Sequence, residues 1–345
     1  MRKIESMRKF IILTLFSAIG YAQESPRYLF DDLYFADPSV HVFDGKIYIY
    51  PSHDIQTDVK DAANGAHFNM KDYHVLTLND VNQKAKDQGI ALKLEDVSWA
   101  KQQLWAPDVA KKGNKYYLYF PAKDKNDVFK IGVATSKSPT GPFKAEKNPI
   151  SGTYSIDPTV LNDNGKYFIY FGGLKGGQLQ EYRNNQHSKN YPELQKEENA
   201  LLPKIALLKS NMKELAEEPK DVLILDENGN QLKSADQHRR FFEGVWIHQY
   251  NSKYYLSYST GETHKLVYAI GDNPYGPFTF QGEILSPVVG WTTHHSIVEI
   301  DKKWYLFYHD SKMSGGKSYL RSLKVRELNY DETGKIIPMN GQDKY

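Results

Sequence analysis

A short polar turn followed by a run of aromatic and aliphatic residues recurs five times along the chain. The turn carries residues such as Asp, Gly, Asn and Ser, and the run combines Tyr, Phe or Trp with Ile or Leu. A small polar turn that leads into aromatic and β-branched residues is typical of a β-hairpin. The five copies begin at Phe43, Lys112, Asp163, Tyr250 and Ile300. The pattern therefore predicts five copies of one β-unit.

A second strand-like segment follows the aromatic run. It is clearest at residues 131–143 and 267–278, where the run ends in a Pro/Gly turn, and looser at 74–78 and 320–325. From about residue 30 onward the chain shows little helical periodicity. Five units over roughly 310 residues give about 62 residues each, which suits propeller blades with insertions. We therefore expect an all-β protein in which residues 23–345 form a single five-bladed β-propeller.

Long segments follow the first and the third aromatic runs. The second of these, residues 189–236, is rich in Lys and Glu, and its part 221–229 has the pattern of a strand and a turn. We expect this region to supply outer strands of the third blade together with a charged loop, and not to form a separate domain.

The first 22 residues have the pattern of a secretory signal peptide. They combine a basic start, a short apolar run and the small residues Gly20 and Ala22 near the cleavage point. The apolar run is too short to span a membrane. The chain has no cysteine, which excludes disulfides and a lipid anchor on a lipobox cysteine. We therefore expect cleavage of this segment and a periplasmic or secreted protein.

Charge narrows the range of partners. The signal segment carries four basic residues and one acidic residue, so its removal changes the formal net charge from +2 to −1. A nearly neutral chain does not offer the basic surface that nucleic acids or anionic membranes require. We therefore expect no nucleic-acid partner and no membrane insertion. The aromatic content of 13% suits both β-structure and contact with sugars.

A polar residue stands upstream of each aromatic run, beside a small, helix-breaking or His neighbour. If the five strands are arranged radially, these side chains converge on one axis and form a site. The five positions are Asp37, Asp108, Asp157, Glu243 and the pair His294-His295.

Three of these positions, Asp37, Asp157 and Glu243, suit glycoside hydrolysis. One carboxylate must activate water, a second must protonate the leaving oxygen, and a third can raise the pKa of that acid by like-charge repulsion. A single Asp-Pro pair is explained equally well by turn formation. Three carboxylates at matching repeat positions favour a catalytic role over turn formation alone.

These residues also belong to five short motifs, which are Ala36-Asp37-Pro38-Ser39-Val40, Trp105-Ala106-Pro107-Asp108, Ile156-Asp157-Pro158-Thr159, Phe242-Glu243-Gly244 and His294-His295-Ser296-Ile297. In order and approximate spacing they resemble the motif series of the family 43 glycoside hydrolases, from about residue 34 to about residue 325. The resemblance implies a five-bladed propeller that hydrolyses xylosides or arabinosides with inversion.

The resemblance also implies a role for each carboxylate. Asp37 would be the general base that activates water, Glu243 the general acid, and Asp157 the residue that holds and tunes this acid. Inversion requires the base and the acid to lie about 6.5–9.5 Å apart, because a water molecule must fit between them and the sugar.

The fifth unit supplies further candidates through the same resemblance. A His near the axis would help to hold a central cation or water, often calcium, and we favour His295 over His294 for this role. Calcium prefers oxygen ligands, so one His among waters would form a loose site. Arg321 would bind the sugar, and an inter-blade salt bridge is the alternative for this residue. No dinucleotide or phosphate-binding motif is present, and no organic cofactor is expected.

Three more residues are candidates for substrate binding. Trp105 could stack on a sugar face because Trp offers a large amphipathic surface, although core packing explains it nearly as well. His53 and Asp54 follow the first aromatic run and could reach the pocket. Asp108 is a fourth carboxylate near the axis, or a structural one.

The sequence thus favours an exo-acting β-xylosidase or α-L-arabinofuranosidase that acts on plant hemicellulose oligosaccharides. Long loops after the first and third aromatic runs could narrow the site to a pocket. An endo-arabinanase would instead need a groove open at both ends. A non-catalytic sugar-binding propeller is the alternative from another class, since fold does not determine function. Such a protein would not need a paired acid and base.

Overall fold

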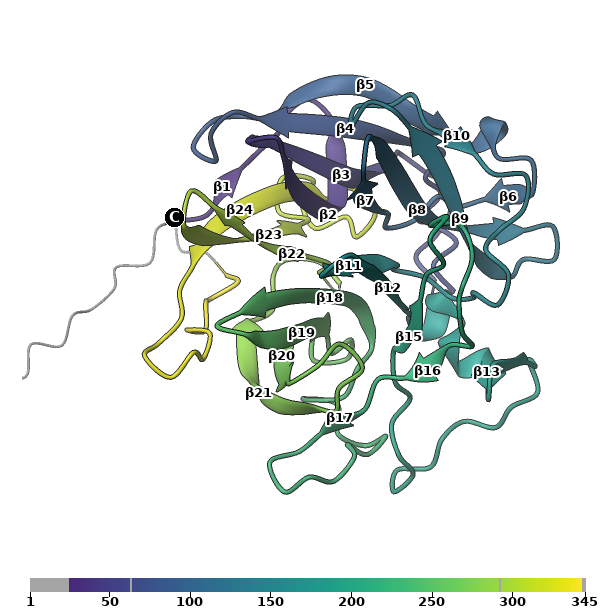
Figure 1. The fold of residues 1–345 in the computed structure, drawn as a ribbon, viewed down its shortest axis with the longest axis vertical. Helices are drawn as coiled ribbons and strands as arrows, with labels where there is room; N and C mark the ends of the chain where they lie inside the picture. Colours follow the sequence, from purple (N-terminus) through teal and green to yellow (C-terminus); the bar gives the residue numbers. More distant parts are fainter. Residues whose placement is uncertain (1–24, 63, 292, 343–345) are drawn as a thin grey trace, which may run out of the picture.

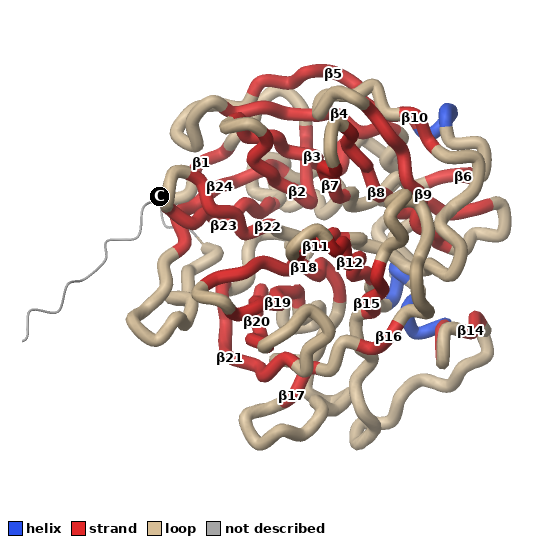
Figure 2. Tube along the Cα trace, in the orientation of Figure 1, coloured by secondary structure: helices blue, strands red, loops and turns tan. Residues whose placement is uncertain are grey.

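The computed structural model describes residues 25–62, 64–291 and 293–342. Within these ranges five sheets form a ring around a central axis, and helix is limited to η1 (Leu94–Asp96), η2 (Lys175–Gly177) and η3 (Leu179–Glu181) (Figure 1 and Figure 2). The all-β, five-bladed propeller is confirmed. No helix in the described ranges is long and apolar enough to cross a membrane. The signal peptide expected at residues 1–22 lies outside these ranges and stays a prediction.

The strands divide into five sheets in chain order. The first contains β2 (Tyr34–Phe43), β3 (Lys46–Asp54), β4 (Asp72–Leu78) and β5 (Lys86–Lys93). The second contains β6 (Ala100–Gln102), β7 (Asp108–Lys112), β8 (Lys115–Asp124), β9 (Phe129–Ser136) and β10 (Lys144–Ala145). The third contains β11 (Thr159–Asp163), β12 (Lys166–Phe171), β15 (Lys204–Leu207) and β16 (Lys220–Asp221).

The fourth sheet contains β17 (Ile224–Leu225), β18 (Glu243–Tyr250), β19 (Lys253–Ser259), β20 (Leu266–Gly271) and β21 (Phe278–Leu285). The fifth contains β22 (Ser296–Ile300), β23 (Lys303–Asp310), β24 (Ser322–Leu328) and β1 (Arg27–Tyr28). A separate two-stranded hairpin, β13 (Tyr182–Arg183) with β14 (Gln186–His187), lies in the insertion that follows β12.

The recurring aromatic run forms the second strand of every blade. The innermost strands β2, β7, β11, β18 and β22 surround the centre of the ring, and each contacts its neighbours around the ring (Figure 1). Each is joined to its aromatic strand by a two-residue turn. In the turns Asp44-Gly45, Asn164-Gly165, Asn251-Ser252 and Asp301-Lys302 both residues have positive φ, which is the backbone of tight hairpins.

A tyrosine occupies the fifth position of the aromatic strand in the first three blades. Tyr50, Tyr119 and Tyr170 are all buried. Their hydroxyls donate hydrogen bonds to carbonyl groups in the next blade, at Pro139, Met212 and Pro274. A buried Tyr needs a partner for its hydroxyl, so these bonds fix the position of neighbouring blades as the rings fill the space between them.

The charged insertion after β12 differs from the prediction in one respect. β15 and β16 extend the third blade as expected. Ile224–Leu225, however, forms β17, which pairs in parallel with β21 of the fourth blade. The segment 221–229 was expected to belong wholly to the third blade, and this part of the prediction is wrong. The chain crosses between blades here because Val222 and Ile224 are both buried in the core that these blades share.

The ring is closed by its first strand. β1 pairs with β24, so the fifth sheet contains both ends of the propeller. The next residue, Leu29, is buried, donates its N–H to the Leu323 carbonyl and accepts from the N–H of Ala85 in the first blade. β1 therefore covers the backbone edge that β24 would otherwise expose.

Candidate active site

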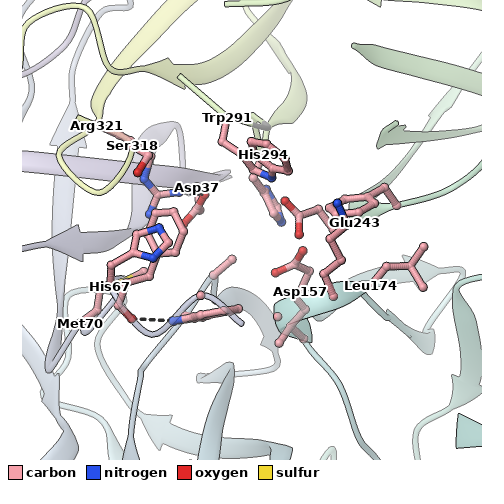
Figure 3. A pocket seen from close by; sticks show the side chains of 18 of the residues that line it. Asp37, His67, Met70, Asp157, Leu174, Glu243, Trp291, His294, Ser318 and Arg321 are labelled. Atoms are coloured by element: carbon pink, nitrogen blue, oxygen red, sulfur yellow. Dashed lines mark hydrogen bonds and ion pairs between the residues drawn. The ribbon is translucent and has the colours of Figure 1, made fainter. Parts of the chain in front are cut away.

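A cavity of about 380 Å³ lies where the inner strands begin. Its size is within the range of small-ligand sites. Asp37, Asp157 and Glu243 all line it, so the three carboxylates identified by the repeat register meet in one place (Figure 3). Glu243 and Asp157 lie together on one side, and Asp37 lies across the cavity beside Arg321.

The backbone explains how the two Asp-Pro motifs present their carboxylates. Asp37 and Asp157 have φ values of 50° and 56°, a left-handed conformation that non-glycine residues rarely adopt. The ladder between β2 and β3 also shifts register between Ala36 and Ser39. Such a bulge redirects a side chain, and local strain of this kind is concentrated at functional sites.

Glu243 reaches the cavity by a related arrangement. The residue begins β18, where the ladder with β19 shifts register between Glu243 and Trp246. Gly244 has a φ of 69°, and its N–H donates to Oδ2 of Asp157 at 2.8 Å. The turn that positions Glu243 therefore also holds its neighbouring carboxyl group.

Arg321 lies between two buried carboxylates. Its Nη1 donates to Asp37 Oδ1 at 2.8 Å. Its Nε and Nη2 donate to the two oxygens of Asp54 at 2.8 and 2.7 Å, and its backbone N–H donates to Asp54 Oδ2. The two-pronged contact with Asp54 fixes the plane of the guanidinium, and this in turn fixes its position beside Asp37.

The electrostatics separate these two carboxyl groups. Burial disfavours the charged form of Asp37, but Arg321, with smaller effects of His309 and His294, outweighs burial and lowers the pKa to about 2. Burial dominates for Asp54 and raises its pKa to about 6, although Arg321 opposes this. Asp37 is therefore ionised throughout the neutral and mildly acidic range.

The opposite side of the cavity favours a bound proton. Burial raises the pKa of Asp157 well above its ordinary value, and the charges of Glu243 and Asp37 add to this effect. Two neighbouring carboxyl groups of this kind titrate as a pair and share a proton. The N–H of Gly244 donates to Asp157 and opposes part of this rise in pKa, because it favours the negative charge on Asp157.

The two histidines of the fifth blade occupy different places. His294 lines the cavity, and among the described residues neither of its ring nitrogens has a hydrogen-bond partner. His295 is fully buried and does not line the cavity, and its Nε2 pairs with the Ser257 hydroxyl at 2.6 Å. Consecutive residues before β22 thus point in different directions, so His294 faces the cavity while His295 lies beneath its wall, and the predicted role of His295 in holding a cation stays a prediction.

Trp105 forms part of the cavity wall. Its ring packs on Phe129, and its Nε1–H donates to the Phe68 carbonyl at 2.8 Å. Gly65 approaches the ring so closely that a Cβ atom there would lie 2.4 Å from it. Trp105 thus lines the cavity, as predicted, and it also packs densely against the loop that follows β3.

Loops from different blades complete the wall. The loop after β3 supplies Asp61, His67 and Phe68, and the segment after β12 supplies Lys175. The Ser318 hydroxyl donates to Asp61 Oδ2 at 2.7 Å and so joins the loops of the first and fifth blades across the rim. The sequence repeat carries no information on these contacts, because they join insertions that have no counterpart in the other blades.

Trp291 is exposed at the rim of the cavity. Its side chain is 40% exposed, and its carbonyl contacts Nδ1 of His264 at 3.1 Å. The Lys175 ammonium, which also pairs with Glu262, lies 5.4 Å from its ring centre. Trp291 lies outside the repeated motifs, and its exposure is a property of the fold, so the sequence pattern does not identify it.

Three of the remaining candidates lie outside the cavity. Asp54 acts on it only through Arg321, whereas His53 points away and pairs with Asp72 on β4. Successive residues of a strand face opposite sides of the sheet, so His53 and Asp54 cannot both face the site, and the expectation for His53 is not met. Asp108 is buried, and its Oδ1 contacts both the Ser39 hydroxyl and His41 Nε2 of the first blade. Its Oδ2 accepts from the Val160 N–H of the third blade, so Asp108 joins three blades at the axis.

Comparison with known proteins agrees with this geometry. Residues 34–336 match the family model described as glycosyl hydrolases family 43. A xylosidase/arabinosidase of Bacteroides ovatus is 59% identical over 92% of this chain and 98% of its own, and a β-xylosidase of Xylanibacter ruminicola is 52% identical over 90% and 98%.

A solved structure is similar over nearly the whole fold. It is a family 43 β-xylosidase/α-arabinofuranosidase from a compost microbial metagenome, in complex with xylotriose and in a calcium-free form. The two chains are 53% identical and superpose with a TM-score of 0.91 over 93% of this chain and 99% of the other.

Proposed function

The chain belongs to glycosyl hydrolase family 43, and from this premise we propose that it removes xylose or arabinofuranose from the non-reducing end of hemicellulose oligosaccharides with inversion. The single observation that carries the proposal is the contrast between the carboxyl groups of one cavity. Asp37 has a pKa of about 2, while the pKa of Asp157 beside Glu243 is raised well above the ordinary value. A base and an acid are thus available at the same pH.

In this proposal Asp37 is the general base. Its charge is held by Arg321, and its carboxylate faces the cavity from the side opposite Glu243 (Figure 3). A water between Asp37 and the anomeric carbon would lose a proton to Asp37 as it attacks. The leaving oxygen would take a proton from Glu243 on the other face of the sugar ring.

Asp157 tunes the acid. Its carboxyl group and that of Glu243 repel each other when both are charged, so the pair keeps one proton, which Glu243 gives to the leaving oxygen. Gly244 directly follows Glu243, and its N–H donates to Asp157, so the backbone beside the acid also holds Asp157 in place. His294, Trp105 and Arg321 would contact the sugar, His294 through its unpartnered ring nitrogens.

The shape of the site favours exo action over an endo-arabinanase. The link between Asp61 and Ser318 joins loops of the first and fifth blades, and Lys175 pairs with Glu262 of the fourth blade at the rim. An endo-acting enzyme needs a groove that is open at both ends for its polysaccharide substrate, and such links between loops obstruct one. A non-catalytic sugar-binding propeller is disfavoured because it has no need of carboxyl groups with opposite pKa shifts.

A calcium ion near the axis is also proposed. Nδ1 of His295 is buried and, in the described part of the chain, has no hydrogen-bond partner, which fits a contact with one hydrated ion. Calcium takes six to eight oxygen ligands, so water would supply the others. When bound, the ion would add positive charge beneath the site. Together with the expected signal peptide, the proposed substrate suits a periplasmic or secreted enzyme that degrades plant cell-wall oligosaccharides.

Kinetics of two variants test the function. Asp37→Asn and Glu243→Gln keep the size of each side chain but remove the base and the acid. We expect each to lower kcat on xylotriose by at least about a thousandfold, because general acid and base catalysis each contribute on that order. Far-UV circular dichroism controls for folding. Near-normal turnover in either folded variant would refute the assignment.

A further inference from the structure

A cluster of ionisable side chains lies outside the cavity, on the first blade. Strand β3 supplies His53, β4 supplies Asp72 and His74, and β5 supplies Asp87. One ligand atom each of His53, Asp72 and His74 lies within 4.8 Å of the other two. No role in the proposed reaction accounts for this grouping of two imidazoles and a carboxylate.

The distances suit a metal ion with short bonds. Asp72 Oδ1 lies 2.6 Å from His53 Nδ1 and 3.7 Å from His74 Nε2. The ligands of a tetrahedral zinc ion, with bonds of about 2.1 Å, lie roughly 3.4 Å from each other. Movements of about 1 Å, together with loss of the hydrogen that His53 Nδ1 donates to Asp72, would therefore bring the three atoms to coordinating positions.

Asp87 determines which ring nitrogen of His74 carries the hydrogen. Its Oδ2 lies 2.8 Å from His74 Nδ1, so this nitrogen donates its hydrogen to Asp87. In neutral imidazole the other nitrogen, Nε2, then carries a lone pair, and it faces the negatively charged Asp72. A metal cation between these two atoms would be attracted by both. A carboxylate that orients a ligating His in this way is a regular feature of metal sites.

The surroundings also suit an ion that enters from solvent. The four side chains are between 10% and 24% exposed, which leaves a path from the surface. On the inner side the ring of Phe35 lies 5.3 Å from the His53 ring and 5.4 Å from the His74 ring. An apolar wall behind the ligands keeps water away from one side of the site and strengthens the attraction between ion and carboxylate.

We propose that His53, Asp72 and His74 bind one divalent transition-metal ion of the zinc class, with Asp87 orienting His74. Two imidazoles and a carboxylate favour such ions over calcium, which prefers oxygen ligands. The site is separate from the calcium position proposed at the axis. It is also independent of the proposed hydrolase function, because none of its ligands lines the cavity.

Titration of protein without a histidine tag tests the proposal. We expect isothermal titration calorimetry with Zn²⁺ to show one site per chain, and Co²⁺ to give the visible absorption of a site with nitrogen ligands. Ca²⁺ should not compete. His74→Ala and Asp72→Asn should abolish binding, whereas Asp87→Asn should weaken it by about 10- to 100-fold. His187→Ala, which removes an exposed His paired with Glu181, should leave binding unchanged.

Each outcome bears on the proposal. The absence of a one-to-one Zn²⁺ site in the unmodified protein would refute it, as would full binding in Asp72→Asn. Circular dichroism controls for folding of the variants. X-ray absorption of the Zn²⁺ complex needs no variant, and a spectrum without two imidazole ligands would refute the assignment as well.

Discussion

At the scale of single residues, the position of Arg321 determines the charge on the catalytic side of the cavity. The guanidinium contacts Asp37 with one nitrogen and Asp54 with two. Asp37 consequently has a pKa of about 2, whereas burial raises that of Asp54 to about 6. Across the cavity, burial and Glu243 raise the pKa of Asp157. The residue that must accept a proton is thus ionised while the pair that must donate one retains it.

The pH dependence of kcat/KM follows from these shifts. The base is active when deprotonated, and its pKa of about 2 places the loss of activity below about pH 4. The acid is active when protonated, so activity should fall only as the pH rises through the raised pKa of the Asp157/Glu243 pair. A pH series with an aryl xyloside measures both limits. Asp157→Asn should move the alkaline limit to lower pH, and an acidic limit above about pH 5 would contradict the account.

Asp54 should contribute to stability through Arg321. Asp54→Asn leaves a buried guanidinium with one carboxylate in place of two, and breaking a buried ion pair costs about 3–5 kcal/mol. We expect a loss on the order of 3 kcal/mol in the free energy of unfolding, measured with urea, and a lower kcat. The control is Asp31→Asn, which breaks an exposed pair with Lys84 and should cost less than about 1 kcal/mol. Equal losses would show that Arg321 does not depend on Asp54.

At the scale of elements, the loop after β3 positions the wall of the cavity. Gly65 has a φ of 68°, and a Cβ atom there would lie 2.4 Å from the Trp105 ring. Trp105 is held from the same loop by the Phe68 carbonyl. The loop after β3 therefore holds the Trp105 motif of the second blade in position, although the two segments are separated in sequence.

Gly65→Ala should displace Trp105. We expect a decrease of kcat/KM on xylotriose by at least about tenfold, because a small misplacement at a site has large kinetic effects. Gly45→Ala is the matched control, since Gly45 has a φ of 76° but a Cβ atom there would have no neighbour within 4 Å. It shares the backbone strain without the clash. Equal kinetic effects in the two variants would contradict the role of this packing.

The repeat also shows how far the sequence predicts the site. Asp37, Asp157 and Glu243 could be found because each lies nine or ten residues before the start of an aromatic strand, a spacing that local hairpin turns determine. Phe68, Asp61 and Trp291 could not, because they lie on insertions whose course depends on contacts with other blades. Alternation along β3 directs Asp54 toward the site and His53 away from it. The pairing of β17 with β21 depends on a strand that is distant in sequence, so no local pattern predicts it.

At the scale of the whole molecule, the ring is closed by the pairing of β1 with β24. The segment around β1 also contributes Leu29, which contacts both the fifth and the first blade through backbone hydrogen bonds. The five-fold repeat predicted the blades, but it carried no information on which strand completes the last of them.

Removal of this strand should destabilise the propeller. A chain that begins at Asp31 lacks β1 and the buried Leu29, and burial of one Leu alone is worth about 2–3 kcal/mol. We expect a loss of at least about 3 kcal/mol in the free energy of unfolding by urea. A chain that begins at Ser25 retains β1 and serves as the control. Equal stability of the two chains would show that closure does not depend on β1.

The central claim is that Asp37 and Glu243 act on opposite faces of the sugar, and the anomer released first tests it most directly. Proton NMR of xylotriose hydrolysis at early times distinguishes the two anomers before they equilibrate. The account predicts that α-xylose appears first, because a water activated by Asp37 attacks the β-xyloside from the opposite face in a single step. Initial release of β-xylose would contradict it, since retention requires a covalent intermediate and a carboxylate acting as nucleophile.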